Sequence, residues 1–476
     1  MNWNQIALMQ NEIVLTIIIL LVLISDLIVK KENKKILSWV AIILFGIQTV
    51  IGFLPVSEGE LFGGMFKTTA LISGFKSILN IGVLLIVLQS ASWLHSKLED
   101  VSKMGEFYAV LFSSVLGIYF MLSAGHFLIL YIGLELSILP VSALAAYEIY
   151  NRRSSEAAIK LILSAAVSSA VFLFGISILY AVGGSLYFDA LIGKFTVSYL
   201  SVLGLVFVFA GLGFKISLVP FHFWTADVYE GAPTPISNYL SVISKAGAVF
   251  ILMILMFIVF RTMQEIWIYM VYGLTVLTMF IGNFFALRQK NLKRFLAYSS
   301  IAQAGFILMA MVSADHYGVA SIVYFMAIYV FSNIGAFGVV EAVAMYSGKE
   351  NMDDYAGLYR TNPMLSLVMM LSLFSLAGIP PLAGFFGKFF LYTAAASKGF
   401  YVLVFIAVVN VTISLYYYLL VIKSSFLHKS DNPIPYFKSD NFMRVSLFVV
   451  AITLIGLGLY SPFYDYIHSI SNIINF

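Results

Sequence analysis

Long apolar runs recur along the whole chain, and they constrain the fold more than any other feature of the sequence. A helix needs about 20 mostly apolar residues to cross a bilayer, because its backbone polar groups must be hydrogen-bonded within the segment itself. By this criterion we expect about fourteen transmembrane helices. Their ranges are 11–29, 36–54, 71–93, 106–123, 125–149, 156–181, 199–229, 235–260, 266–287, 292–313, 318–346, 364–397, 400–426 and 442–462.

The composition supports a membrane protein. Of the 476 residues, 61% are hydrophobic and 11% are charged, whereas a soluble domain has roughly 25% charged residues. A soluble enzyme and a nucleic-acid-binding protein are therefore excluded. The longest polar stretch, at about 428–441, is predicted to be a loop. We expect an all-α polytopic membrane protein that forms a single membrane domain over 1–476.

Basic residues are distributed unequally between alternate loops, and this asymmetry predicts the orientation. Lys and Arg accumulate in the cytoplasmic loops of membrane proteins. With the loop around Lys30 in the cytoplasm, most loop Lys and Arg fall on that side, and the opposite side keeps only Lys67, Lys76, Lys194, Arg261 and Lys398. Both chain termini then lie outside. Lys30 is also the first basic residue and follows the apolar run 13–29, an order that differs from that of a cleavable signal peptide.

Four ionisable residues lie deep inside predicted helices: Glu135, Lys215, Lys245 and Lys388. An ionisable group near the bilayer centre costs at least about 2.5–3.5 kcal/mol, so it normally faces the protein interior or a water-filled cavity. Because such residues are functional by default, we interpret these four as a proton-transfer set. The alternative is a set of static ion pairs that fixes helix packing.

Three further features allow two interpretations each. Lys160 lies one to two turns into its helix with Glu156 at i−4, so it fits either a transfer role or a helix-end ion pair. His222 follows Pro220 and either relays protons or satisfies freed backbone carbonyls. The segment 227–235 holds acidic residues and no basic one, so it is either an acidic proton-collecting mouth or a capped turn.

Two predicted helices are interrupted beside a buried lysine. The segment 211–222 places glycines and a proline around Lys215, and the segment 378–388 places glycines and two prolines before Lys388. Proline removes an i→i−4 hydrogen bond and glycine loosens the turn, which frees backbone groups that only protein or water satisfies at that depth. Interrupted helices at corresponding positions of two halves indicate an internal repeat with an ion site.

The interrupted helices are the seventh and the twelfth, so they are five helices apart. We therefore expect two five-helix repeats, helices 4–8 (101–262) and helices 9–13 (263–427), and an odd helix number makes them inverted. Three helices in 1–100 and a final helix in 428–476 flank the repeats. The alternative is that the prolines merely kink packed helices.

The sequence lacks motifs for metal, nucleotide or hydrolytic chemistry. It has no cysteine, its six histidines are scattered, and it has no zinc, nucleotide-binding or nucleophile-elbow motif. We therefore expect no metal or cofactor in this chain. Burial lowers the proton affinity of an amine, and a nearby carboxylate raises it. A carboxylate that moves can therefore make a buried lysine take up and release a proton. We hypothesise that Glu135 pairs with Lys215, and that weakening of this pair passes a proton through water to Lys245 and on to Lys388.

One motif resembles a known family. The string Pro-Phe-His-Phe-Trp-Thr-Ala-Asp-Val-Tyr-Glu-Gly-Ala-Pro-Thr-Pro at 220–235, followed by Ser244-Lys245-Ala, closely resembles the N-type antiporter-like membrane subunits of proton-translocating NADH–quinone oxidoreductase, respiratory complex I. The resemblance extends over essentially the whole chain. It implies that Glu135 and Lys215 match the ion pair of the family, that Lys160 matches a lysine near it, and that Lys245 and Lys388 match the central and distal lysines.

The resemblance also implies a place in a larger enzyme. NADH, FMN, iron–sulfur clusters and quinone are expected in partner subunits, and this chain is expected to be a non-redox translocase subunit driven by quinone reduction elsewhere. The expected partners are other membrane and peripheral subunits of complex I, including neighbouring antiporter-like subunits, and the lipid bilayer, but no nucleic acid. The fourteen-span length favours a bacterial inner membrane.

Related proteins provide the alternatives. The L-type subunit of the family carries extra C-terminal helices, and the M-type typically has a glutamate where Lys388 stands. A second functional candidate is a subunit of a cation/proton antiporter, which exchanges Na⁺ or K⁺ against H⁺. Hard cations prefer oxygen ligands, whereas lysine dominates the middle of this membrane domain. A third candidate is a structural scaffold with inert ion pairs.

Overall fold

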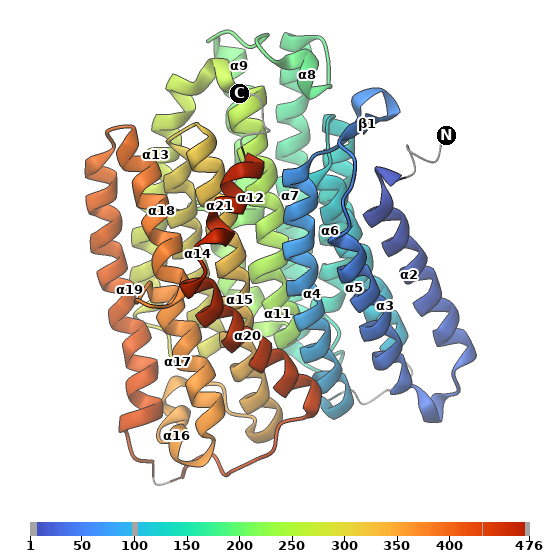
Figure 1. Ribbon diagram of the computed structural model, residues 1–476, viewed down its shortest axis with the longest axis vertical. Helices are drawn as coiled ribbons and strands as arrows, with labels where there is room; N and C mark the ends of the chain where they lie inside the picture. The colour runs from blue at the N-terminus through green and yellow to red at the C-terminus, as the bar shows by residue number, and fades with distance from the viewer. Residues whose placement is uncertain (1–6, 98–102, 431, 472–476) are drawn as a thin grey trace.

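The chain folds into a bundle of membrane-length helices (Figure 1). The computed structural model describes residues 7–97, 103–430 and 432–471. Within these ranges, twelve helical segments are long and apolar enough to cross a membrane: α2 (Gln10–Ile28), α4 (Ala70–Lys97), α5 (Met104–Leu122), α6 (Phe127–Ala145), α7 (Arg152–Gly183), α9 (Tyr199–Ile216), the α11 to η5 segment (Thr234–Val259), the η6 to α13 segment (Arg261–Ala286), α14 (Leu292–Met311), α15 (His316–Ser347), α19 (Tyr401–Leu427) and α20 (Asn441–Leu459). Two shorter apolar helices are α3 (Ile36–Gly52) and α17 (Pro363–Ala377). The predicted all-α polytopic fold is confirmed, with helix in each of the fourteen predicted spans.

Short elements connect these helices. The sheet content of the described residues is one antiparallel pair, β1 (Gly59–Leu61) and β2 (Phe66–Thr68). The remaining short elements are η1 (Lys31–Asn33), η2 (Phe62–Gly64), α8 (Phe188–Leu191), η6 (Arg261–Met263), η7 (Met352–Tyr355), α16 (Leu358–Thr361) and α21 (Pro462–Ser471). The segment 428–476, for which one helix was predicted, therefore contains α20 and the additional short helix α21. Proline is favoured in the first turn of a helix, and α21 begins at Pro462.

Both predicted breaks are present. The seventh span consists of α9 and α10 (Phe223–Gly231), and the twelfth consists of α17 and α18 (Ala383–Ser397). Each first half ends at a residue with a left-handed backbone, Ser217 with φ 69° and Gly378 with φ 86°. Glycine adopts this conformation readily and serine does so rarely. The chain therefore stops each helix inside the bundle and starts a second one after a short irregular segment.

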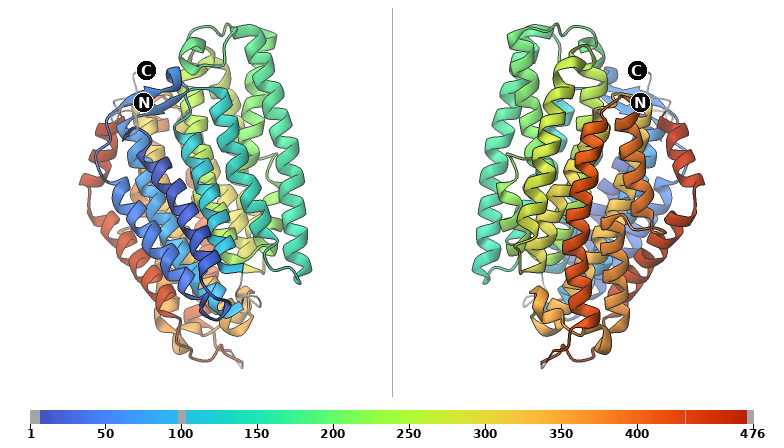
Figure 2. Two further views of the ribbon diagram at one scale, coloured as in Figure 1. Left: turned by 90° about the vertical axis from the view of Figure 1, so that its right-hand side faces the viewer. Right: turned by 90° about the vertical axis from the view of Figure 1, so that its left-hand side faces the viewer.

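The eighth and eleventh spans lie at the centre of the bundle. Every residue in the apolar window of α15 is buried, whereas most residues in the corresponding window of α20 are not. A helix that is apolar all round belongs in a core, and a helix with exposed apolar residues faces lipid in a membrane protein. Figure 2 shows α2 in dark blue and α20 in red on outer faces of the bundle.

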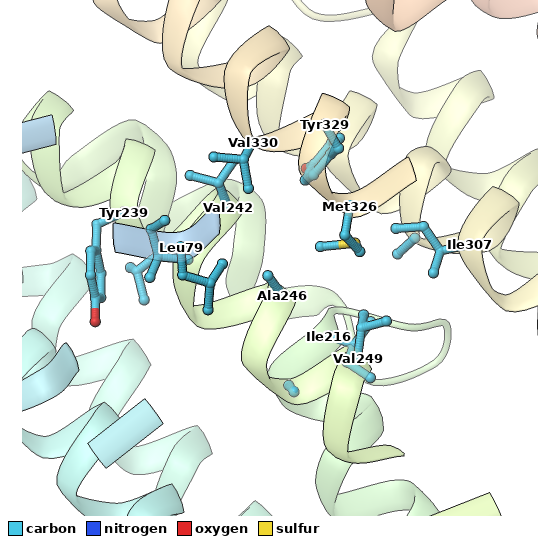
Figure 3. Packing of buried hydrophobic residues seen from close by; sticks show 14 of the residues in the cluster. Leu79, Ile216, Tyr239, Val242, Ala246, Val249, Ile307, Met326, Tyr329 and Val330 are labelled. Atoms are coloured by element: carbon cyan, nitrogen blue, oxygen red, sulfur yellow. The ribbon is translucent and has the colours of Figure 1, made fainter. Parts of the chain in front are cut away.

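Small residues allow the central helices to pack closely. A Cβ atom at Gly82 of α4 would lie 2.7 Å from Val330 Cγ1 on α15 and 2.9 Å from Ile243 Cδ1 in the eighth span. Figure 3 shows Val242 beside Val330 and Leu79 in the same apolar cluster. Membrane helices associate through such close van der Waals contact, because lipid provides no hydrophobic drive for their packing.

The loops are divided between the two ends of the bundle in the predicted way. Backbone hydrogen bonds join the loops expected on the cytoplasmic side, through the pairs Leu292–Glu350, Lys290–Met352 and Gly357–Ser424. Other hydrogen bonds join the loops expected outside, through the pairs Lys67–Ser123, Phe127–Leu186 and Thr262–Phe195. We call these the basic end and the opposite end. In Figure 1, α16 marks the basic end at the bottom, and β1 and α8 mark the opposite end at the top.

Candidate functional site

Lys215 lies in the last turn of α9, directly before the first break. Its ammonium group donates a hydrogen bond to the carbonyl oxygen of Leu134, at 3.4 Å, and another to the hydroxyl oxygen of Ser137. These two residues are three positions apart on α6 and therefore share one face of that helix. Glu135 is rotated by about 100° from Leu134 and lies beside Tyr131 on a neighbouring face.

The predicted direct ion pair between Glu135 and Lys215 is not formed, and that expectation is corrected here. The reason is the rotation of α6, which presents Ser137 rather than Glu135 to the ammonium group. One carboxylate oxygen of Glu135 is buried and has no hydrogen-bond partner among the described residues. Electrostatic attraction between Glu135 and Lys215 nevertheless acts across the α6–α9 contact.

Lys245 is the first residue of α12 (Lys245–Ile254), in the middle of the eighth span. A π-helical segment, η4 (Leu240–Ser244), separates it from α11 (Thr234–Tyr239), and a second one, η5 (Leu255–Val259), follows α12. The Lys245 ammonium group donates to the carbonyl and the hydroxyl oxygen of Ser300 on α14, at 3.1 and 3.0 Å. Short π-helical segments occur often at functional sites, and this one lies directly beside the central lysine.

Lys388 lies on α18, after the second break, and reaches back across it. Its ammonium group donates to the carbonyl oxygens of Leu376 and Ala377, at 2.7 and 3.1 Å. These belong to the last turn of α17, where helical carbonyls lack partners within the helix. The ammonium nitrogen also lies 4.7 Å from the ring centre of Phe306 on α14. Lys215, Lys245 and Lys388 are 3%, 0% and 3% exposed.

Helix α14 connects the central lysine to the distal one. Gln303, three residues after Ser300, donates to the carbonyl oxygen of Leu376 at 3.0 Å and to the hydroxyl of Tyr418 at 3.1 Å. The same Leu376 carbonyl accepts the hydrogen bond from Lys388. Since Ser300 and Gln303 share a face of α14, polar groups extend without a long gap from Lys245 to Lys388.

A second polar connection runs from Lys215 toward the eighth span. The carbonyl oxygen of Ser137 accepts a hydrogen bond from the Ser114 hydroxyl at 2.7 Å. That hydroxyl lies 2.8 Å from the hydroxyl of Tyr239, at the end of α11. Tyr239 precedes Lys245 by six residues in the same span, and the π-helical segment η4 lies between them.

Lys160 lies toward the basic end and is partly exposed. Its ammonium group pairs with Glu156 at 2.7 Å and with Asp227 at 2.6 Å. Asp227 also binds Arg294 of α14 at 2.6 Å, and Glu230 binds the same guanidinium at 3.0 Å. The helix-end pair is thus present, and the acidic segment 227–235 is bound to basic residues of two other spans. A transfer role for Lys160 stays a prediction.

His222 precedes α10 at the first break and is buried. Its ring packs against Phe223, with ring centres 4.5 Å apart. The Nδ1 atom has no hydrogen-bond partner among the described residues. No ion pair or hydrogen bond within the described ranges joins His222 to the three buried lysines, so its relay role stays a prediction.

Three buried charged residues were missed or misplaced by the sequence analysis. Lys76 was assigned to the outer loops, but it lies inside α4 and forms a buried ion pair with Glu12 of α2, at 2.5 Å. Glu341 lies inside α15 and is 1% exposed. A usable signal existed, because these three residues fall within the predicted spans 71–93, 11–29 and 318–346. All three lie near the ends of those spans, where a charged residue fits a loop as well as the membrane interior.

The site consists of amines, hydroxyls and amides rather than a ligand cage. Within the described ranges, no group of three or more His, Asp or Glu side chains is placed to hold a metal ion. Amines and hydroxyls exchange protons, and buried polar atoms without protein partners call for water. The chemistry that these residues support is therefore proton transfer along a row of buried groups.

The fold defined by two interrupted spans is shared with antiporter-like membrane proteins. A family model described as "NADH:quinone oxidoreductase/Mrp antiporter, TM" matches residues 124–414. NADH-quinone oxidoreductase subunit N of Phocaeicola vulgatus is 47% identical over 467 residues, which cover 98% of both chains. The chain therefore belongs to the NADH:quinone oxidoreductase/Mrp antiporter family, and the family resemblance found in the sequence is confirmed.

Solved structures support the same assignment. A chain of respiratory complex I from Thermus thermophilus with bound aureothin is 28% identical, with a TM-score of 0.78, and the match covers 94% of this chain and 97% of that one. A chain of the Mrp complex from Dietzia sp. DQ12-45-1b has a TM-score of 0.89 at 16% identity, with 99% and 97% covered, which shows a shared fold alone. The protein is thus an integral, multi-pass membrane protein of this family.

Proposed function

We propose that this chain is a proton-translocating, antiporter-like membrane subunit of an NADH–quinone oxidoreductase. The observation that supports this most is the polar connection along α14, where Ser300 binds Lys245 and Gln303 joins the Leu376 carbonyl that binds Lys388. Relatives called NADH-quinone oxidoreductase subunit N match over nearly the whole chain. The expected partners are the other membrane and peripheral subunits of that complex.

In this proposal the chain itself is a non-redox translocase subunit. NADH, FMN, iron–sulfur clusters and quinone reside in partner subunits, and quinone reduction there provides the energy. The lysine row lies in a bacterial inner membrane, with the basic end in the cytoplasm and both termini outside, in line with the distribution of Lys and Arg.

The geometry suggests how a proton is released from Lys215. Its ammonium group binds Ser137, while Glu135 lies two residues earlier on the same helix. A small shift of α6 or a side-chain rotation exchanges one partner for the other. Two charges 4 Å apart interact by about 4 kcal/mol at an effective dielectric constant near 20. That exceeds the roughly 2.3 kcal/mol needed to move one charge against 100 mV, so a partner exchange is large enough to drive transfer.

The test is the Lys245→Ala variant in the assembled complex, reconstituted into liposomes. We expect fewer protons translocated per NADH oxidised, while NADH oxidation with a soluble electron acceptor is unchanged. Lys194→Ala, which removes an exposed lysine at the opposite end, is the matched control. Wild-type proton translocation by Lys245→Ala would refute the proposal. Proton-coupled Na⁺ or K⁺ flux through the wild-type complex would favour the antiporter alternative instead.

A further inference from the structure

A cavity of about 910 Å³ lies at the basic end of the bundle. Its walls come from both predicted repeats, with Arg153 and Glu230 from the first and Lys293, Glu341 and Glu350 from the second. It is therefore lined by charged groups of both signs. A cavity of this size and polarity holds many water molecules.

Glu341 is the most deeply buried carboxyl group of this wall. Both of its carboxylate oxygens lack a hydrogen-bond partner among the described residues. Lys293 attracts it, but the Lys293 ammonium group is held by the Ala232 carbonyl at 2.9 Å and lies 3.7 Å from Glu350. An ionised carboxylate without donors costs several kcal/mol. Glu341 therefore lines the cavity without a hydrogen-bond or ion-pair partner among the described residues.

A row of side chains leads from Glu341 toward the centre of the bundle. Phe337, Asn333 and Tyr329 follow at successive i−4 positions and hence line one face of α15. At 1.5 Å per residue, the twelve residues from Glu341 to Tyr329 span about 18 Å, roughly half the thickness of a bilayer. Both polar side-chain atoms of Asn333 are buried without a partner among the described residues, which calls for ordered water there.

The inner end of this row meets the central lysine. The hydroxyl of Tyr329 donates a hydrogen bond to the carbonyl oxygen of Ser241 at 3.2 Å, and it lies near Asn333 and Ser300. The Ser300 hydroxyl accepts a hydrogen bond from Lys245 at 3.0 Å. The hydroxyl of Tyr229 also lies beside Ser300. The polar groups between the cavity and Lys245 therefore come from α10, α14 and α15, and the apolar side chain of Phe337 lies between Glu341 and Asn333 in the row.

We propose that Glu341 is a proton-loading residue that takes protons from the cavity and supplies them to Lys245. The carboxylate accepts a proton from water in the cavity and becomes a neutral acid. It then passes the proton to water beside Asn333, and the hydroxyls of Tyr329 and Ser300 hand it to the neutral amine of Lys245. Glu341 returns to the carboxylate and Lys245 becomes an ammonium. This inference rests on the proposed function as a proton-translocating subunit.

The experiment uses the assembled complex in liposomes with Glu341→Gln, Glu341→Asp and Lys245→Ala. Loss of the loading group slows proton uptake during turnover by about tenfold or more, and Glu341→Asp restores part of the rate because it still carries a proton. Glu265→Gln removes the same charge at an exposed site of the opposite end and serves as the control. Infrared difference spectra of the purified complex provide a second measurement, in which a protonated-carboxyl band shifts in Glu341→Asp and is lost in Glu341→Gln.

The outcomes separate this inference from the proposed function. If Lys245→Ala lowers translocation and Glu341→Gln leaves uptake at the wild-type rate, the loading role is refuted and the function stands. If Lys245→Ala changes nothing, the function itself fails and the loading role fails with it. If Glu341→Gln does not assemble, the infrared comparison of wild type with Glu341→Asp decides, and identical carboxyl bands refute the proposal.

Discussion

The buried ion pair between Glu12 and Lys76 makes a strong prediction about stability. The ammonium nitrogen lies 2.5 Å from the nearer carboxylate oxygen, and both side chains are 2% exposed. Lys76 also donates to the Ser123 hydroxyl at 2.7 Å. The removal of one partner leaves the other charge buried and uncompensated, which costs about 3–5 kcal/mol. We therefore expect Glu12→Leu and Lys76→Met each to lower the free energy of unfolding by about that amount.

The double variant is expected to behave differently. Glu12→Leu together with Lys76→Met replaces the pair by apolar side chains of similar volume, and such replacements are often neutral or stabilising. The loss of unfolding free energy in the double variant should therefore be smaller than the sum of the losses in the two single variants. Glu60→Leu, which removes an exposed partner of Lys67 at 3.1 Å, is the control and should cost less than about 1 kcal/mol.

The assay is unfolding of the purified chain in mixed micelles with increasing dodecyl sulfate, followed by tryptophan fluorescence. The four unfolding free energies of wild type, the two single variants and the double variant form a thermodynamic cycle. Additive losses, or single losses below about 1 kcal/mol, would refute the reasoning that this pair is buried and coupled.

Two further predictions concern packing and the α14 connection. A Cβ atom at Gly117 would lie 2.4 Å from the backbone nitrogen of Ser137, so Gly117→Ala should cost about 1–3 kcal/mol or more in the same unfolding assay. Gly46→Ala, with no atom within 4 Å, should be close to neutral. Gln303→Leu removes the hydrogen bonds to Leu376 and Tyr418, so we expect fewer protons translocated per NADH oxidised in the liposome assay, at near-normal complex assembly. Gln289→Leu, in the loop after α13, is its control, and equal translocation by the two variants would contradict the α14 connection.

The helices and their interruptions could be predicted from the sequence because their causes are local. Twenty apolar residues satisfy their own backbone hydrogen bonds wherever they lie in the bundle. A proline or a glycine likewise acts on the turn that contains it, so the segments 211–222 and 378–388 predicted breaks that are present. The burial of Lys215, Lys245 and Lys388 followed from the same reasoning, since each lies too deep in its helix to reach the membrane surface.

The partners of the buried charges could not be predicted in the same way. Whether Lys215 meets Glu135 or Ser137 depends on the rotation of α6 by about 100° per residue, and apolar residues on all sides of that helix leave the rotation undetermined. Glu12 and Lys76 lie 64 residues apart on different helices, so only tertiary packing brings them together. Helix rotation and helix neighbours are fixed by side-chain packing, which the hydropathy pattern does not encode.

Both interrupted spans place a lysine beside the C-terminal end of their first half-helix. Lys215 belongs to the first half-helix itself, whereas Lys388 belongs to the second half-helix. Helix α9 runs from the opposite end toward the centre, and Lys215 lies in its last turn. Helix α17 runs from the basic end toward the centre, and Lys388 of α18 binds its last carbonyls. Each ammonium group therefore lies at the C-terminal end of a first half-helix, where the dipole favours a cation.

The magnitudes explain why a break is needed beside Lys388. A charge near the bilayer centre costs about 2.5–3.5 kcal/mol, and a helix dipole returns at most about 2 kcal/mol. Hydrogen bonds to a charged group contribute about 1.5–3 kcal/mol each, and carbonyls without helical partners accept them only where a helix ends. An uninterrupted α17 would use the carbonyls of Leu376 and Ala377 in its own hydrogen bonds, and Lys388 would then lack acceptors. The interruption thus supplies Lys388 with acceptors that offset the cost of its charge at this depth.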